Sequence, residues 1–583
     1  MPVTGQSEPR LFTMPPGAPF LPSLAEALAE GRLVPGFRAD GDPLAWADAT
    51  IYVPTRRAAR ELRSVLVDRA GGRAAILPTI RALGEVDDDA GLFLPASGAE
   101  ADLAPPISVL DRLLLLAPLV QAWKRRLPAH VAALFEEEVV VPASAADAVW
   151  LARDLAALLD EVETEGVGWA NLQGLVERDL AGWWQVTLDF LNIVIEHWPN
   201  ILADRQRSDP VAHRDALLRA EAARLAAHPP AGPVVAAGST GSIPATAELL
   251  SVIARLPNGA VVLPGFDRGM DARSRALLEA PTPQPAVLGH PQYGMLKLLR
   301  RIGVTSADVA EIAEADNDLA LRARLVAEAF RPADTTDQWT VRRSGFDQRD
   351  VNEAVAGISL VEAANERDEA VAIAIALRQA VEPEGRTAAL VTGDRELARR
   401  VCAELARFGI RADDSGGTPL SATPPGRFLT ALTAAVFRPG DPVPVLALLS
   451  HPLLRLGHER AKLRRAAELI ELVALRGGTG RPDVMNLADL FEERAANVGE
   501  GKRPPPWLPR FGESDFADAR AVLVALSDAL APLGELRTQP DIDVPTAARA
   551  TVLALEAAAR ASDSSLGSLY DGDAGERLAT FLR

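Results

Sequence analysis

The sequence predicts an α/β protein whose parallel β-sheets are interrupted by long helical segments. Short apolar runs such as Ile51–Val53 end in turn residues and lead directly into a helical pattern, as buried parallel strands do. By contrast, residues 106–224 and 424–583 repeat apolar residues at intervals of three and four almost throughout, which indicates helices. We therefore expect two α/β domains, each carrying a large helical insertion.

Composition narrows the class of protein. The 583 residues are 48% hydrophobic, enough for large cores, and the length suggests about four domains. Cys402 is the only cysteine, so this chain alone cannot build a disulfide framework or a cysteine-ligated metal site. The sequence has neither a secretory signal nor an apolar run long enough to span a membrane, so we expect a cytoplasmic protein with no membrane partner. The net charge of −18 argues against a general nucleic-acid coat but permits a narrow basic channel.

The first strand candidate is Leu11–Met14, followed by a loop and a helix over Leu24–Ala29. In a motor ATPase this loop would cradle phosphates, which requires glycines, a lysine and a Ser/Thr that binds magnesium. The loop Pro15–Phe20 has a single glycine, Gly17, no lysine, and three prolines that each remove a backbone donor. It is chemically unsuited to a triphosphate.

The stretch from Thr50 to Val86 holds the strongest binding signal. Ile51–Val53 reads as a strand and Arg56–Val67 as a helix, and Ala75–Leu77 reads as a second strand. Each strand is followed by a threonine and then an arginine, at the sheet edge where α/β proteins bind ligands. Hydroxyls, guanidinium groups and backbone N–H groups suit a polynucleotide backbone. The residues expected to contact DNA here are Thr55, Arg56, Arg57, Arg60, Thr79 and Arg81.

The helical segment of residues 106–230 contains five tryptophans. Exposed tryptophans can stack on the bases of a single strand, but their helical spacing favours packing in a core. These residues are Trp150, Trp169, Trp183, Trp184 and Trp198.

A strand-then-loop pattern returns at Val234–Ala237 and again at Ala260–Leu263. Ser239 and Thr240, in the glycine-bounded loop after the first of these strands, are further candidates for DNA contact. A second α/β unit follows, with strands expected at Ile358–Val361 and Ala388–Val391. Its helices are expected at Arg367–Val381 and Glu396–Phe408.

Three segments resemble motifs of superfamily 1 helicases. Thr55–Leu62 is similar to motif Ia, T-N-K-A-A-x-E-M, and Thr79–Leu83 to the next motif, T-F-H-S-L. Leu390–Ile410 is similar to motif IV. The surrounding sequence, including LPTIRALGEVDDD, resembles sequences of the AddB family of alphaproteobacterial helicase–nuclease subunits.

The resemblance implies two RecA-like motor domains with helical insertions, the second motor domain being incomplete. The implied domains are 1–105 and 231–340 (1A, with linker), 106–230 (1B), 341–430 (2A) and 431–583 (2B-type). Three nucleotide-site positions depart from the family: Gly17 lies in a loop without lysine, Ala237 replaces the magnesium-binding acid, and Gly393 replaces an arginine.

The resemblance further implies a subunit that binds single-stranded or duplex-end DNA during double-strand-break repair and scans for a hotspot sequence. It would pair with an AddA-type motor–nuclease subunit and act at the nucleoid. A C-terminal nuclease domain with magnesium and an iron–sulfur cluster would lie beyond residue 583, so we expect this chain to be part of a longer protein. Within it we expect no catalytic residue, cofactor or metal site. An active helicase with an atypical nucleotide site and a helical interaction scaffold remain as alternatives.

Overall fold

A computed structural model describes most of the chain, and it divides after Leu360 into two compact units, residues 1–360 and 361–583. The described residues are 8–39, 42, 44–72, 74–84, 103–126, 144–167, 169, 181–476, 482–498, 505–539 and 541–583. None of the helices in these ranges is both long and apolar enough to cross a membrane.

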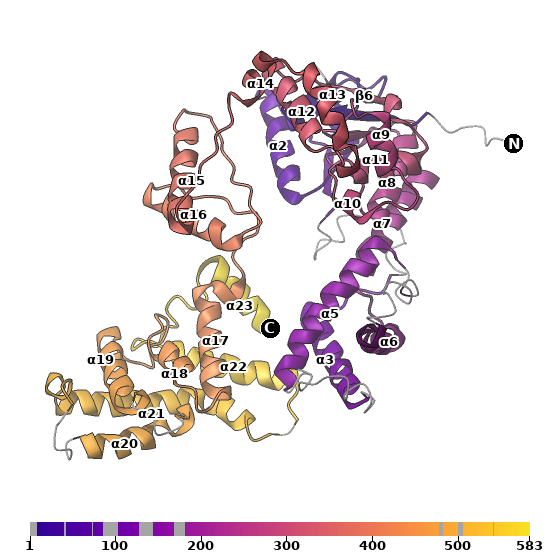
Figure 1. Ribbon diagram of the computed structural model, residues 1–583. Helices are drawn as coiled ribbons and strands as arrows, with labels where there is room; N and C mark the ends of the chain where they lie inside the picture. Colours follow the sequence, from indigo (N-terminus) through magenta and orange to yellow (C-terminus); the bar gives the residue numbers. More distant parts are fainter. Residues whose placement is uncertain are drawn as a thin grey trace. The chain divides into compact units, whose positions relative to one another are not determined.

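The first unit is built on a six-stranded sheet in which every strand pairing is parallel, so the predicted α/β class is confirmed (Figure 1). The strand order is β3-β2-β4-β5-β1-β6. The strands are β1 (Leu11–Met14), β2 (Thr50–Val53), β3 (Thr79–Ala82), β4 (Val234–Ala237), β5 (Gly259–Pro264) and β6 (Val309–Glu311).

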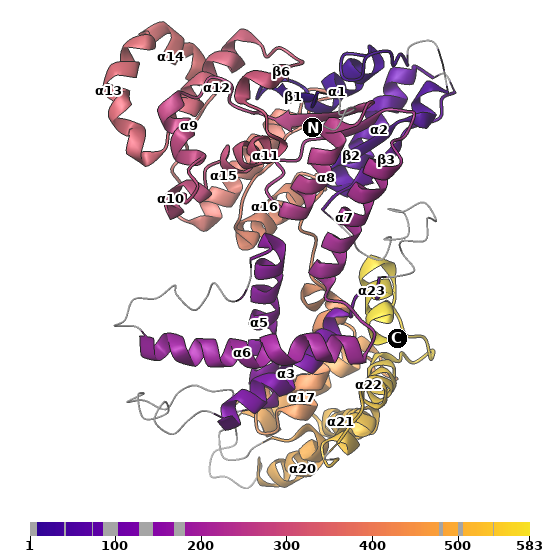
Figure 2. The ribbon, with the colours of Figure 1, turned by 90° about the vertical axis from the view of Figure 1, so that its right-hand side faces the viewer.

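Helices cover both faces of the sheet, which makes three layers (Figure 2). Alternate residues of each strand enter different cores, as the period of two requires. Val234 and Ala236 join one core with helices α7, α8 and α11. Val235 and Ala237 join the opposite core with α1 and α2. The bounds are α1 (Phe20–Ala29), α2 (Arg56–Ala70), α7 (Pro210–Ala227), α8 (Pro244–Arg255) and α11 (Tyr293–Ile302).

The expected strand at Ala75–Leu77 is wrong. That segment has no strand partner, Ile76 is 53% exposed, and the chain enters the sheet only at Thr79. The register places Thr79 beside Thr50 and Ala82 beside Val53. Thr79 therefore begins its strand, whereas Thr55 follows the end of the neighbouring one.

Between β3 and β4 lies a helical segment with its own core, as predicted. Trp198 is buried there, and its indole N–H donates to Asp209, 3.2 Å away. Trp150 instead is 65% exposed, so the expected core position is wrong for this residue. Figure 2 shows α6 lying across α5. The bounds are α3 (Val109–Arg126), α5 (Ala145–Glu165) and α6 (Ala181–Asp204).

After β5 the chain forms short helices around the carboxyl ends of β5 and β1. These are α9 (Ala272–Leu278), α10 (Pro285–Leu288), α12 (Asn317–Ala329), α13 (Trp339–Arg342) and α14 (Gln348–Val355).

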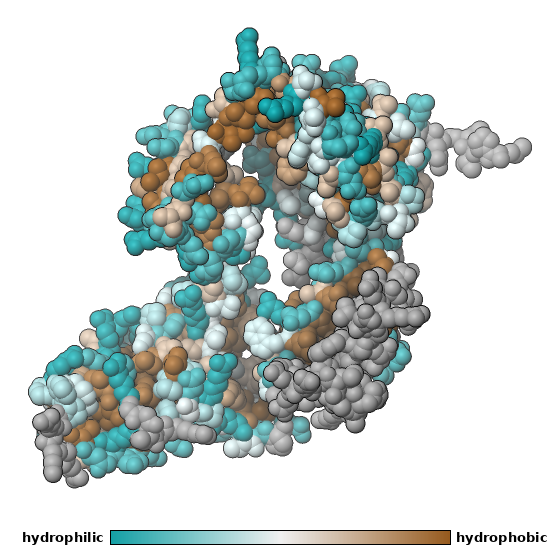
Figure 3. Space-filling model, in the orientation of Figure 1, coloured by the Kyte–Doolittle hydropathy of each residue, from teal (hydrophilic) through white to brown (hydrophobic). Residues whose placement is uncertain are grey.

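The second unit begins with α15 (Glu366–Val381) and α16 (Arg395–Arg407), both predicted. The two strands expected beside them are absent: residues 358–361 and 388–391 have no strand partner among the described residues. Leu360 is 88% exposed and Val391 94% exposed, and Figure 3 shows hydrophobic surface over this part. The apolar pattern of a buried strand is therefore present without the sheet that would bury it.

The rest of this unit is an all-helical body with a continuous core from Phe428 to Leu578, which matches the helical segment predicted there. Its helices are α17 (Pro424–Phe437), α18 (Pro442–Leu449), α19 (Arg460–Ile470), α20 (Leu487–Val498), α21 (Glu513–Leu536), α22 (Val544–Ala559) and α23 (Gly572–Leu582).

Candidate functional site

The loops after β2 and β4 lie side by side at the carboxyl edge of the sheet, because these two strands are neighbours. A side chain at Gly238, the first residue after β4, would lie 3.4 Å from Pro54, which follows β2. Gly238 has φ +85°, a conformation that favours glycine. Because the register sets Tyr52 beside Ala236, Thr55 and Ser239 each follow three residues later and lie at the same edge of the sheet, with Thr240 next in the chain.

Thr55 caps helix α2. The Ala58 N–H donates to its Oγ1 at 3.1 Å, which fixes the first turn of the helix. Thr55, Arg56 and Arg57 are exposed at this end of a 15-residue helix. Backbone N–H groups and the partial positive charge of a helix start favour an anion at such a position.

Arginines continue along the exposed face of α2. Arg56, Arg60 and Arg63 are spaced four and three residues apart, so they form one row on the helix surface. Arg60 and Arg63 have no carboxylate partner within the described ranges, whereas many other arginines of this acidic chain are paired. The row extends the cationic surface away from the sheet edge.

Thr79 is not part of this group. It lies level with Thr50, five residues before Thr55, which corresponds to about 16 Å along the strands. Its side of the sheet is the amino edge, where parallel strands begin. The predicted pairing of the two threonine–arginine turns at one edge is therefore not what the structure shows.

Arg81 is committed to a buried ion pair. Its Nη1 lies 3.1 Å from the Glu221 carboxylate of α7, with the two side chains 14% and 3% exposed. The Tyr52 hydroxyl donates to the same carboxylate, and Arg224 Nε lies 2.7 Å from it. Burial and the neighbouring Glu221 raise the pKa of Tyr52 well above its usual range. Arg81 thus ties the sheet to α7 and is not presented to a ligand.

The loop after β1 lies close to α12. Gly17 has φ +95°, and a side chain there would lie 3.0 Å from carbons of Leu319 on α12. Of the other two predicted nucleotide positions, Ala237 is fully buried at the end of β4, and Gly393 is exposed before α16 in the second unit. The apolar side chain of Leu319 therefore lies near Gly17, where a phosphate-binding loop would need open backbone N–H donors.

Next to this loop is a cavity of about 960 Å³. Its walls come from the loops after β1 and β5 and from α12 and α13, all within the first unit. Sequence reasoning missed the cavity, because α12 is distant in the chain and carries no motif. Its lining includes Pro15, Pro16, Leu319, Val326, Phe330 and Val341.

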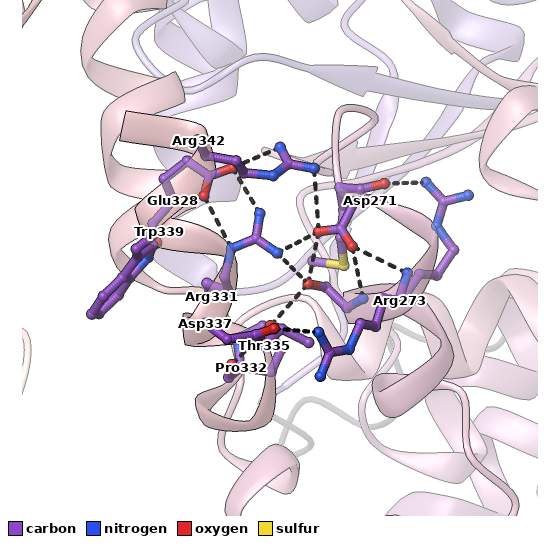
Figure 4. A network of polar contacts seen from close by, with 12 residues as sticks. Asp271, Arg273, Glu328, Arg331, Pro332, Thr335, Asp337, Trp339 and Arg342 are labelled. Atoms are coloured by element: carbon purple, nitrogen blue, oxygen red, sulfur yellow. Dashed lines mark hydrogen bonds and ion pairs between the residues drawn. The ribbon is translucent and has the colours of Figure 1, made fainter. Parts of the chain in front are cut away.

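A network of ion pairs fixes α12 against the loop after β5 (Figure 4). Arg331, whose side chain is 4% exposed, donates to Asp271 at 2.6 Å and to Glu328 at 2.8 Å. Arg342 donates to the same Glu328 carboxylate at 2.9 Å. The Trp339 indole N–H donates to the Glu328 backbone carbonyl at 2.9 Å, which adds α13 to the network.

The network holds the Asp271 carboxylate in the charged form. Burial alone would raise the pKa of Asp271, but hydrogen bonds from Ser274 and Arg331 outweigh it and hold that pKa well below its usual range.

Burial lowers the pKa of His290, which also lines the cavity and whose ring Nε2 lies 2.9 Å from the Phe330 carbonyl oxygen. His290 therefore stays neutral near pH 7.

Across the described ranges, no three His, Cys, Asp or Glu side chains gather as a metal site would require. Comparisons with protein-family models and with curated proteins find no match to this chain.

Proposed function

We propose that this chain is a helicase-like subunit that binds single-stranded DNA and does not hydrolyse ATP. The observation that carries the proposal is that the loops after β2 and β4 are neighbours with exposed arginines beside them, while the loop after β1 has three prolines and no lysine. The parallel sheet is compatible with a RecA-like motor domain.

DNA binding follows from the chemistry of this edge. Thr55, Ser239 and Thr240 offer hydroxyl groups, and the start of α2 offers backbone N–H groups and arginines. Such groups contact phosphates without reading sequence. We propose single-stranded DNA and duplex ends as the ligand, because the motif wording there resembles the strand-gripping motifs of superfamily 1 helicases.

In the proposed setting, the chain acts in double-strand-break resection and recombinational repair as a cytoplasmic, nucleoid-associated protein. It holds one strand and scans it for a hotspot sequence while an AddA-type partner subunit supplies the motor. The net charge of −18 supports confined binding, because most of the surface repels DNA.

A salt titration tests the proposal. The double substitution Arg57→Ala with Arg60→Ala should weaken binding of an oligo-dT strand and reduce the salt slope by about 1.4, two contacts at about 0.7 each. Arg69→Ala, at the far end of the same helix, is the matched control. Unchanged affinity and slope in the double variant would overturn the proposal.

An active helicase with an atypical nucleotide site is the second candidate. It is favoured by the arginines that reach the cavity from elsewhere, such as Arg268 and Arg322. Against it, Arg268 lies 3.5 Å from Glu311, and Arg322 donates its Nε–H to a backbone carbonyl. DNA-stimulated ATP hydrolysis by the purified chain would establish this alternative. A scaffold without DNA affinity would show no shift of single-stranded DNA in a gel.

A further inference from the structure

The cavity beside Gly17 has no role in the proposed DNA binding. It lies at the carboxyl ends of β1 and β5, the position where open α/β sheets bind ligands. Its volume of about 960 Å³ lies within the range of small-molecule pockets, about 300–1,000 Å³. Its place and size are those of a ligand site.

Part of the cavity wall is apolar and open to water. Val326 is 41% exposed, Phe330 58% and Val341 69%, and all three line the cavity. Apolar side chains gathered around one hollow gain free energy when an apolar ligand covers them.

Most charges around the cavity are already paired. Arg331 and Arg342 share Glu328 and Asp271, and Arg268 lies beside Glu311. An anionic ligand would have to compete with these carboxylates for the arginines. The Pro15–Gly17 turn offers it little, because two of its three residues are prolines, which have no backbone N–H.

Arg322 supplies one directional donor. Its Nε–H donates to the Ala354 carbonyl at 2.8 Å, and its terminal amino groups have no hydrogen bond within the described part of the chain. They can donate to a carbonyl oxygen or a ring nitrogen. Nearby, the Arg324 guanidinium lies over the Phe346 ring at 4.4 Å, so that part of the wall is flat and suits another ring.

We propose that this cavity binds a neutral compound with a flat aromatic or heteroaromatic body and one hydrogen-bond acceptor. It excludes nucleoside triphosphates. This site is separate from the DNA-binding loops, so either proposal can fail without the other.

Nile red, a neutral fused-ring dye with a carbonyl acceptor, is the probe, titrated into the full chain. Saturable binding at one site with a shift of emission to shorter wavelength is expected. Ala323→Trp, which fills the cavity, should abolish that site. Phe330→Ser should weaken binding by about ten-fold, because an apolar ring surface is lost; Phe330 is largely exposed, so the fold should persist.

Val391→Ser is the matched control, since it removes an exposed apolar side chain in the other unit. It should leave the dye affinity unchanged, and ATP with magnesium should not displace the dye. Absence of a saturable site, full binding by Ala323→Trp, equal loss in Val391→Ser, or displacement by ATP would each overturn the proposal.

Discussion

The loops after β2 and β4 and the loop after β1 lie at the same edge of the sheet but differ in the polar groups that they present. After β2 and β4 the loops turn on glycine, carry hydroxyl groups and lie beside exposed arginines. After β1 the loop is rich in proline and lies beside arginines that are mostly bound to carboxylates. The same backbone topology therefore presents exposed arginines at one end of the edge, and arginines that are mostly paired with carboxylates at the other.

The difference shows that strand order alone does not decide what an α/β edge binds. Parallel strands place loops at a common edge, but the local residues decide whether donors remain open. Distant helices matter equally, because α12 and α13 line a cavity beside the loop after β1.

The largest expected effect comes from Arg331, which joins α12 to the loop after β5 through its ion pairs with Glu328 and Asp271. Arg331→Met should lower the free energy of unfolding of the first unit by about 3 kcal/mol, since Glu328 and Asp271 would lose a buried partner. Urea unfolding measures this, and hydrogen exchange should show reduced protection in α12. Arg273→Met, which breaks an exposed pair with Asp337, should cost under about 1 kcal/mol. Equal losses in both variants would remove the contrast between buried and exposed pairs.

Acid should lower the stability of the ion-pair network around Asp271. The pKa of Asp271 is lowered in the folded state, so its stabilising effect is complete above its unfolded pKa of about 3.9. That effect is lost as pH falls from this value toward the lowered pKa. Asp271→Asn should cost about 2 kcal/mol at pH 7 and should flatten the fall in stability below pH about 4. Melting curves across this pH range measure it, and an unchanged slope in the variant would contradict the assignment.

A pair of glycine variants gives the smallest effect and compares the two halves directly. Gly17→Ala and Gly238→Ala each place a side chain at positive φ, at a cost of about 1 kcal/mol. Only Gly238→Ala should also weaken single-stranded DNA binding, because the added side chain would lie 3.4 Å from Pro54, the residue before Thr55. Equal DNA affinities of the two variants would contradict the proposal that the loops after β2 and β4 bind DNA and the loop after β1 does not.

Local pattern predicted most elements but not their partners. The helices α2, α15 and α16 and the strands β1, β2, β4 and β5 follow from apolar spacing and turn residues. Ala75–Leu77 has the apolar character of a strand, yet the sheet uses Thr79–Ala82, which contains a charged residue. The burial of Arg81 is possible only because Glu221, 140 residues away, neutralises it, and no local pattern reveals that pairing.

The candidate site was predicted in part for the same reason. Thr55, the α2 arginines and Ser239 follow strand ends that sequence can identify, so their proximity was foreseeable. The contact of Leu319 with Gly17 joins segments far apart in the chain, and nothing in either segment signals it. The segments 358–361 and 388–391 show the converse, because they have the apolar pattern of a strand but no neighbouring strand to pair with among the described residues.

The contact between Leu319 and Gly17 has a consequence for protein engineering. Grafting a lysine and additional glycines into the loop after β1 would return the sequence of a phosphate loop. Leu319 of α12 would still lie 3.0 Å from a side chain placed at Gly17, and most arginines of the adjacent cavity would remain paired with carboxylates. Reviving nucleotide turnover in this protein would therefore require changes in α12 as well as in the loop.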